Sequence, residues 1–144
     1  MIAIARMRPE HVAGFRLQRK QAMLAGNLAD PDYVAALVGS GHAYTVLVDG
    51  RAIAFGGCLE LWKDRAYMWS LIGEDAGPHM RVLVRATAGF LKAAPWRRIE
   101  AAVASDFRAG HRLVRLLGFE FEGRMKAYSP DGADHDLYAR VKHG

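Results

Sequence analysis

The densest group of side chains that could do chemistry lies between residues 108 and 115. Arg108, His111, Arg112 and Arg115 fall at helical spacing, so they form one basic face of a predicted helix. Such a face is usually solvated, and the other ligands it could contact are phosphate groups or a nucleic acid. Neither helix-turn-helix spacing nor a stacking-aromatic strand motif accompanies it. A basic module that contacts nucleic acid is therefore only a minor alternative.

Nucleophilic and metal chemistry have weaker support. Cys58 is the single cysteine, which excludes an internal disulfide and a site built from several thiolates. The apolar, strand-like sequence 55–61 around it favours a packed, inert thiol over a nucleophile. The histidines are scattered without metal-ligand spacing, and no Ser/His/Asp order indicates a nucleophile elbow. We therefore expect no metal.

The composition is that of one ordinary domain. The chain has 144 residues, 51% of them hydrophobic, which is enough to bury a core, and we expect a single domain over residues 1–144. No apolar run is long enough to cross a bilayer, and the first residues lack the order of a signal peptide. We therefore expect a soluble, cytoplasmic protein with no membrane partner. The net charge of +5 suits an acidic ligand, a nucleic acid or a negatively charged surface, and does not separate them.

The first elements are predicted from short local signals. The apolar segment 2–6 predicts an edge strand. A proline at position 9 suits the first turn of a helix, and the apolar pattern after it predicts a helix over residues 9–26. Asp30 followed by Pro31 combines an N-cap with a first-turn proline, so a second helix is predicted up to Gly39.

The middle of the chain predicts a hairpin and a central strand. Asp49-Gly50 is a strong signal for a tight turn, because both central positions want positive φ, and it predicts a hairpin over residues 43–61. Gly56-Gly57 within the second strand suggests a bulge or a close backbone approach. The nearly all-apolar segment 66–72 predicts a strand in the centre of the sheet.

The second half alternates helices and strands. The predicted elements are a long helix from Pro78 that Pro95 ends, a strand over 98–104, a helix capped by Ser105 or Asp106 that Gly118 ends, and a hairpin of 119–128 with 134–141 around Asp131-Gly132. The early hairpins exclude a purely parallel sheet, whereas the two later strand–helix–strand crossings favour parallel pairing in the middle. We predict an α/β fold of the α+β kind, a twisted mixed sheet of about seven strands with helices on both faces.

This order of elements, together with the sequence Leu-Leu-Gly-Phe-Glu-Phe-Glu-Gly-Arg at 116–124 and the final Leu-Tyr-Ala-Arg-Val at 137–141, resembles the GNAT superfamily of acyl-CoA N-acyltransferases. The resemblance covers essentially the whole chain. It implies transfer of an acyl group, most simply acetyl, from coenzyme A to a primary amine. The implied partners are acetyl-CoA or another acyl-CoA and an unknown amine acceptor, and by resemblance the fold commonly pairs as a homodimer.

The resemblance also implies where the cosubstrate lies. In GNAT enzymes the loop after the fourth strand holds the CoA pyrophosphate on backbone N–H groups at a helix N-terminus. Carried over to this chain, the residues that would hold the pantetheine and the diphosphate are Ile72, Gly73, Gly77, Pro78, His79 and Met80, with Arg81 or Arg85 adding positive charge.

The loop departs from the family's pattern in four positions. Glu74 stands where the family has a Gln or Arg, and Asp75 adds a second negative charge. Pro78 lacks one of the N–H donors, and His79 is larger than the small side chain usual there. Each carboxylate costs about 1 kcal/mol of diphosphate affinity at surface dielectric, which weakens binding without excluding it.

The residues for acid–base chemistry are only partly present. Val114 stands where many members have the Tyr that protonates the departing thiolate, and Phe107 stands where they have Asn. Glu60, Glu100 and Asp106 are the candidates for the base; their alternative roles are a solvated edge carboxylate or, for Asp106, a helix cap. We select Glu60 or Glu100. The residues that could replace the missing acid are Cys58, Tyr67 and Tyr128, none of which is marked by its surroundings.

A second resemblance fits these departures. The segments 107–112 and 67–71 are also similar to a subgroup of GNAT-like proteins carried by tailed phages and prophages, some of which are internal virion or morphogenesis proteins. The alternative function is therefore a catalytically inactive, GNAT-fold virion or assembly protein. Its partners would be other virion proteins, and its location would be the virion.

Overall fold

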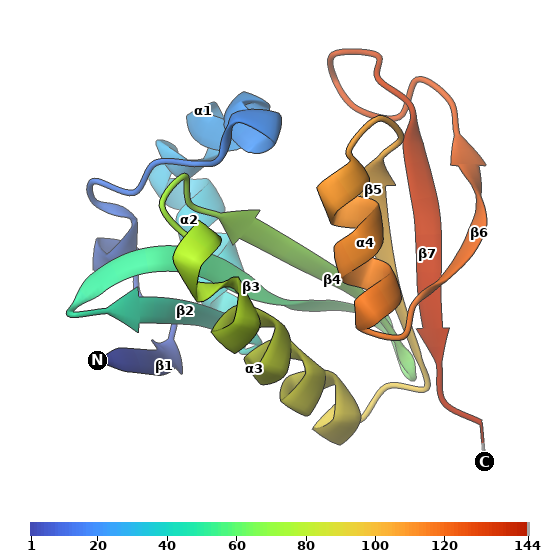
Figure 1. Cartoon of the computed structure of the whole chain (residues 1–144), viewed down its shortest axis with the longest axis horizontal. Helices are drawn as coiled ribbons and strands as arrows, with labels where there is room; N and C mark the ends of the chain where they lie inside the picture. The colour runs from blue at the N-terminus through green and yellow to red at the C-terminus, as the bar shows by residue number, and fades with distance from the viewer. Residues whose placement is uncertain (144) are drawn as a thin grey trace. The chain divides into compact units, whose positions relative to one another are not determined.

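Among residues 1–143, which the computed structural model describes, seven strands form one mixed sheet in the order β1-β2-β3-β4-β5-β7-β6 (Figure 1). The strands are β1 (Ile2–Arg6), β2 (Ala43–Val48), β3 (Arg51–Trp62), β4 (Arg65–Ile72), β5 (Arg98–Ala104), β6 (Glu120–Met125) and β7 (His135–Val141). The predicted mixed sheet is confirmed. The apolar strand β4 lies between β3 and β5, as its sequence predicts.

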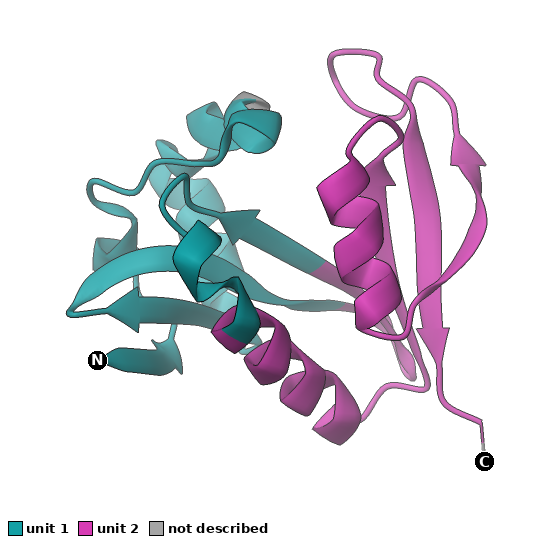
Figure 2. Ribbon diagram, viewed as in Figure 1, with its two compact units in different colours: residues 1–59, 69–81 teal, residues 60–68, 82–144 magenta. Residues whose placement is uncertain are grey.

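The connections contain α-helices and short 3-10 helices. They are η1 (Pro9–Val12), η2 (Arg19–Leu24), α1 (Ala25–Leu28), α2 (Pro31–Gly39), η3 (Gly77–His79), α3 (Met80–Ala93) and α4 (Arg108–Leu116). None of the described helices is long and apolar enough to cross a membrane. The chain divides into two compact units, residues 1–59 with 69–81 and residues 60–68 with the chain from Val82 onward (Figure 2).

The first unit is built on the β2–β3 hairpin. Asp49 and Gly50 have φ of 50° and 80°, so the predicted tight turn is confirmed. Strand β1 pairs antiparallel with β2 and lies at the end of the strand order. The buried core of this unit consists of Met7, Val34, Leu37, Ala43, Phe55 and Leu71. Helix α2 begins as predicted, because the Asp30 carboxylate accepts a hydrogen bond from the backbone N–H of Asp32 at 2.9 Å.

The predicted helix over residues 9–26 is wrong. Only η1, η2 and the one-turn helix α1 form there, and residues 13–18 between η1 and η2 are not helical. The reason is tertiary: Leu17 forms an isolated antiparallel bridge with Gly73, and the backbone N–H of Gln18 donates to the carbonyl of Ile72 at 2.7 Å. Phe15 meets Phe55 edge-on, with ring centroids 4.7 Å apart. Packing against β4 thus outweighs helix propensity in this segment.

The close backbone approach that the Gly56-Gly57 pair suggests is found at Gly57. A Cβ at this position would lie 2.0 Å from the carbonyl oxygen of His42, so only glycine fits. The irregularity in β3 lies elsewhere: the register shifts between Val46 and Leu47, which pair with Ala54 and Ala52 and leave Ile53 as the extra residue.

The second unit contains the parallel part of the sheet. Residues Arg65–Tyr67 of β4 pair in parallel with Arg98–Glu100 of β5, as the crossing through α3 predicts. The crossing through α4 gives no second parallel pair, because β7 inserts between β5 and β6 and is antiparallel to both. Helix α4 ends before Gly118, as predicted, but its N-cap is Phe107, and no side chain caps it. Ser105 instead donates to Asp136.

Candidate functional site

The loop that joins β4 to α3 lies in the first unit and contains the predicted cosubstrate residues. Gly77 and Pro78 are exposed, and no atom lies within 4 Å of the position a Cβ at Gly77 would take. The backbone amides that donate to carbonyls within the protein are those of Gly73, Glu74, Ala76, His79 and Met80. The amides of Asp75 and Gly77 have no acceptor among the described residues. Two free donors therefore precede α3, at the end of the helix where the dipole attracts an anion.

The charges around this loop are partly compensated. The Asp75 carboxylate forms an ion pair with Arg51 at 2.9 Å, so one of the two adverse charges is neutralised. Glu74 is exposed and pairs with no cation in residues 1–143. Arg81 is exposed at the start of α3. Arg51 was not among the predicted residues; because β3 and β4 are neighbours joined by a tight turn at their other ends, the start of β3 lies beside the end of β4.

His79 lies near the β2–β3 turn. The pKa of Asp49 is lowered, first because the N-terminal ammonium donates to its carboxylate at 2.6 Å and further by the charge of His79. The His79 imidazole does not fill the space at Gly77, because no atom lies within 4 Å of the position that a Cβ there would take.

The end of β4 is occupied by glutamine side chains. The Gln21 Oε1 accepts from the backbone N–H of Ile72 at 2.8 Å, and its Nε2 donates to the carbonyl of Ser70 at 2.8 Å. The side chain of Gln18 donates to the same Oε1 at 3.0 Å. The Gly73 amide donates to Ile53 at 2.8 Å. The backbone amides of Ile72 and Gly73, predicted to hold the pantetheine, therefore already have partners.

The two candidate bases lie in the second unit with different partners. Glu60 is exposed on β3 and accepts from the indole N–H of Trp96 at 2.8 Å. Glu100 is buried on β5, where Arg65 holds both of its oxygens and Arg98 donates to one of them at 2.7 Å. The Arg65 guanidinium, and after it Arg98, lowers the pKa of Glu100 against the opposing effect of burial. Glu100 is therefore held as a carboxylate and is a weaker base than a free one.

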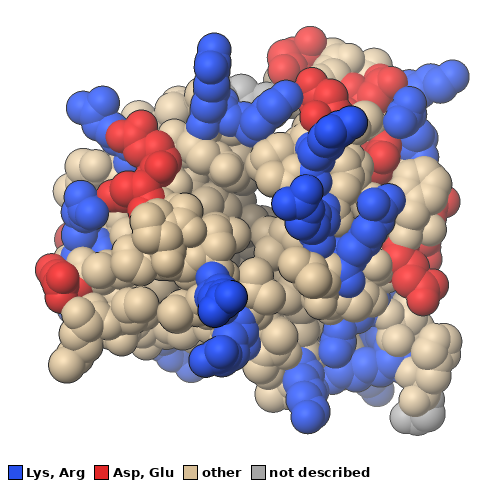
Figure 3. All heavy atoms as spheres, viewed as in Figure 1, with Lys and Arg blue, Asp and Glu red and all other residues tan. Residues whose placement is uncertain are grey.

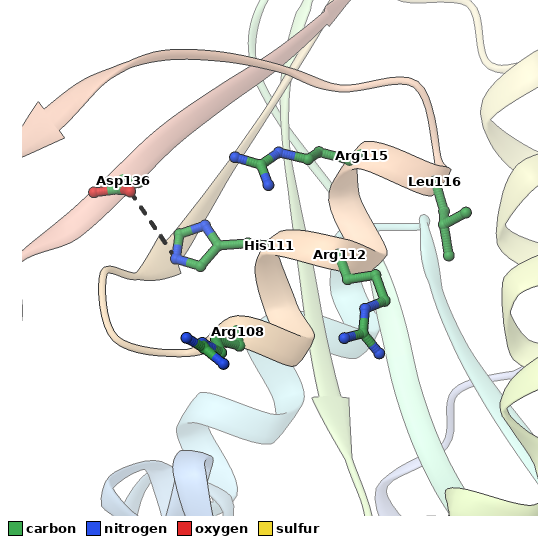
Figure 4. Close-up of a pocket in the computed structure, with 6 residues that line it drawn as sticks. All are labelled: Arg108, His111, Arg112, Arg115, Leu116 and Asp136. Carbon is green, nitrogen blue, oxygen red and sulfur yellow. Dashed lines mark ion pairs between the residues drawn. The ribbon is translucent and has the colours of Figure 1, made fainter.

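A pocket of about 670 Å³ lies on α4 in the second unit (Figure 4). Its lining residues are Arg108, His111, Arg112, Arg115, Leu116 and Asp136. In Figure 4 His111 and Arg115 extend from the helix toward the strand that carries Asp136, whereas Arg108, Arg112 and Leu116 extend to another side of it. In Figure 3 Lys and Arg atoms gather over the region of α4.

His111 is fixed by a network that the sequence did not indicate. Its Nε2 lies 3.0 Å from the carbonyl oxygen of Ser105, and because a carbonyl only accepts, this nitrogen carries a proton. Its Nδ1 lies 2.7 Å from the hydroxyl of Tyr138, which is fully buried. A neutral His111 therefore accepts from Tyr138. The β5–β7 register, which sets Ala101 opposite Tyr138, could have predicted this only if β7 were known to be beside β5.

Among the described residues that line the pocket, Asp136 is the carboxylate, and it already has partners within the protein. Ser105 Oγ donates to it at 2.6 Å, Arg124 lies at 3.3 Å and His111 Nε2 at 4.0 Å. The hydrogen bond from Ser105 is the first cause of its lowered pKa, followed by that from Arg124, against the effect of burial.

The described residues contain no group of three or more His, Cys, Asp or Glu side chains that could hold a metal ion. Cys58 is fully buried, and burial raises the pKa of its thiol to about 12. The packed, inert thiol predicted for Cys58 is consistent with this environment.

No protein-family model matches the chain, and no curated protein is significantly similar to it. Its fold, however, is similar to those of solved acetyltransferases. Ard1 from Thermoplasma volcanium aligns with a TM-score of 0.79 at 13% identity, covering 99% of both chains. An N-acetyltransferase from Staphylococcus aureus aligns with a TM-score of 0.74 at 15% identity, covering 98% of both.

A GNAT-superfamily phosphinothricin acetyltransferase from Sinorhizobium meliloti, solved in complex with acetyl-CoA, aligns with a TM-score of 0.73 at 18% identity, covering 97% of this chain and 88% of its own. The element order, the mixed sheet and these alignments agree over nearly the whole sequence. The chain therefore has the fold of the GNAT-superfamily acetyltransferases.

Proposed function

We propose that this protein is an N-acyltransferase that transfers an acetyl group from acetyl-CoA to a primary amine, and that residues 1–144 form one GNAT-like domain. The observation that carries the proposal is the pair of free amides at Asp75 and Gly77 at the start of η3 and α3. Solved acetyltransferases that cover 97% or more of the chain support the domain.

The diphosphate of the cosubstrate fits the loop by charge and by space. The two free N–H groups and the N-terminal end of α3 attract an anion, and the exposed surface at Gly77 lets it approach. The Arg51–Asp75 ion pair removes one adverse charge. Arg81 supplies a cation in the first turn of α3, while Glu74 still opposes binding. Pro78 has no N–H, and the amides of His79 and Met80 already donate to Ala76 and Gly77, so these three residues add no free backbone donor.

The pantetheine would have to compete with Gln21. A ligand amide that pairs with Ile72 must displace the side-chain amide of Gln21, which makes the same two kinds of hydrogen bond with β4. The exchange replaces one amide by another, so its enthalpic cost is small. What it requires is displacement of the Gln21 side chain from β4.

The chemistry is the attack of an amine nitrogen on the thioester carbonyl. The new C–N bond forms, the C–S bond breaks, the base takes the proton of the amine, and the thiolate leaves and is protonated. Glu60 is the better base of the two candidates, because it is exposed and only one of its oxygens is engaged by Trp96. Glu100 is bound to two arginines.

The two positions where the family has polar residues supply no acid for the leaving thiolate. Val114 is buried and apolar, Phe107 cannot donate, and the Cys58 thiol is fully buried with its pKa raised to about 12. A thiol has an ordinary pKa of about 8.5, so the thiolate can leave unprotonated and take a proton from water. General acid catalysis contributes about 10²–10⁴-fold, and we expect a correspondingly slow enzyme.

The second candidate function is a GNAT-fold protein without catalysis, such as a phage virion or assembly component. It is favoured by the combination of apolar residues at Val114 and Phe107 with the Gln21 side chain bound to Ile72. The phage-borne subgroup, the virion partners, the cytoplasmic location and the homodimer are proposals that need their own measurements.

The test has two parts. Binding of acetyl-CoA is measured as a shift in the melting temperature, and acetyl transfer is measured with a panel of primary amines. A ligand at a hundred times its Kd stabilises the folded state by about 2.7 kcal/mol. Gly77→Leu should fold normally, since the space around Gly77 is open, but it should abolish the shift because its side chain fills the approach to the amides. Gly26→Leu, also in open space, is the matched control. No shift in the unaltered protein at millimolar acetyl-CoA would favour the second function.

A further inference from the structure

The pocket on α4 carries arginines whose positive charges are not paired with other described residues. Arg108, Arg112 and Arg115 are exposed, and none of their guanidinium groups forms an ion pair or a hydrogen bond with another of the described residues. Arg115 makes only a cation–π contact, 6.0 Å from the ring centre of Tyr138. Helix α4 has no acidic residue of its own to balance them.

The neighbouring carboxylates are already paired. Glu100 binds Arg65 and Arg98, and Asp136 binds Arg124 and Ser105. Asp136 therefore adds little net negative charge to the pocket. Like charges four residues apart on a helix, such as Arg108 and Arg112, cost about 0.2–0.5 kcal/mol per pair. A bound anion would offset this repulsion, because both guanidinium groups attract it.

The size and the lining indicate what kind of anion fits. A volume of about 670 Å³ exceeds what a lone phosphate needs and is typical of a pocket for a small organic molecule. Leu116, 67% exposed, gives the pocket one apolar wall. The guanidinium groups suit a phosphate, since each can donate two parallel hydrogen bonds to it. None of the described residues that line the pocket is aromatic and could stack on a base, which argues against a nucleic acid strand.

We propose that the α4 pocket binds the phosphate of a small phosphorylated molecule, with Arg108 and Arg112 as its ligands and Leu116 against the organic part. Arg115, which extends toward the strand of Asp136, adds positive charge to the pocket. The proposal does not require acetyl transfer. The phosphate can come from the 3′-phosphate of a coenzyme A molecule or from a separate phosphorylated compound.

The test is isothermal titration of the full chain with inorganic pyrophosphate at two salt concentrations. We expect saturable binding that Arg112→Gln weakens about tenfold, the loss of one charge-assisted contact. Arg112→Lys keeps the charge without the planar group, so its affinity should lie between those of Arg112→Gln and the unaltered protein. Arg19→Gln, which removes one exposed arginine of η2, is the matched control and should bind as the unaltered protein does.

Three results would overturn the proposal. They are the absence of saturable binding at millimolar pyrophosphate, equal weakening by Arg19→Gln, and affinity for single-stranded DNA that rises with its length. Gly77→Leu should leave this binding intact; if it abolishes binding while Arg112→Gln does not, pyrophosphate binds the loop and not α4. A preference for coenzyme A over 3′-dephospho-coenzyme A that Arg112→Gln removes identifies the 3′-phosphate as the ligand, and equal affinities identify a separate compound.

Discussion

The side chain of Gln21 forms hydrogen bonds with β4 at Ile72 as the backbone of a neighbouring strand would. Its Oε1 accepts from the Ile72 amide at 2.8 Å, while its Nε2 donates to the carbonyl of Ser70, two residues back, at 2.8 Å. Residues two apart on a strand direct their backbone groups to the same edge. One side chain thus satisfies one edge of β4 near its end, and any ligand that pairs with this edge must take the place of that side chain.

Gln21→Ala tests whether this contact opposes ligand binding. We expect the free energy of unfolding to fall by about 1–3 kcal/mol, because Ile72 and Ser70 lose half-buried partners. We expect the affinity for acetyl-CoA to rise, since nothing has to be displaced. Urea unfolding and a titration followed by melting temperature measure the two effects. Gln18→Ala is the control, because the Gln18 side chain reaches only Gln21 while its backbone bond remains. Weaker acetyl-CoA binding by Gln21→Ala would contradict an opposing role.

The Arg51–Asp75 pair predicts opposite effects of two substitutions. Asp75→Asn removes a negative charge beside the free amides and should tighten acetyl-CoA binding about fivefold, the equivalent of about 1 kcal/mol. Arg51→Gln leaves Asp75 uncompensated and should weaken it by a similar factor. Both side chains are exposed, so the stability should change by less than about 1 kcal/mol. Arg97→Gln removes an exposed arginine from a comparable surface pair with Asp64 and should leave the affinity unchanged. Changes of the same sign in both loop variants would refute the charge argument.

Glu100→Gln separates a structural role from a catalytic one. The pKa of Glu100 is lowered by Arg65 and then Arg98, so its contribution to stability is present above its unfolded-state pKa, near 4.5, and is lost as the pH falls through the lower folded-state pKa. Removing one partner of a buried ion pair costs about 3 kcal/mol at neutral pH. We expect that loss in urea unfolding, with a flatter dependence of stability on pH in the acid range. Glu122→Gln, whose carboxylate is more exposed, should cost less than about 1 kcal/mol. Normal stability combined with lost acetyl transfer would instead make Glu100 the base.

Several sequence predictions that depend on adjacent residues were correct, whereas some that depend on contacts between distant residues were not. The turn at Asp49-Gly50, the cap at Asp30 and the central strand 66–72 were predicted correctly, because each depends on a few adjacent residues. The helix over 9–26 was not, since the backbone N–H of Gln18 donates to Ile72 of β4, which lies far along the chain. For the same reason Gln21 and Arg51 were not recognised as neighbours of the cosubstrate loop.

Cys58 should be unreactive in the folded protein. Burial raises the pKa of its thiol to about 12, so the thiolate that reacts with disulfide reagents is scarce at neutral pH. We expect a thiol-reactive chromogenic disulfide to label it only as fast as the protein unfolds, and at once in denaturant. Cys58→Ala should leave acetyl transfer intact. Rapid labelling of the native protein would show that the side chain is accessible and would restore it as a candidate for proton donation.

The backbones of β2 and β3 approach each other closely at Gly57. A methyl group at this position would lie 2.0 Å from the His42 carbonyl oxygen, which is backbone and cannot rotate away, and Gly57 pairs directly with Ala43. Gly57→Ala must therefore shift one strand against the other, and we expect it to lower the free energy of unfolding by about 3 kcal/mol in urea. Gly89→Ala is the matched control, because Gly89 lies within α3 with open space around it and should gain about 0.5–1 kcal/mol from helix propensity. If both variants were stabilised alike, the close approach of the two strands would be disproved, since only an open Gly57 could accept a methyl group without cost.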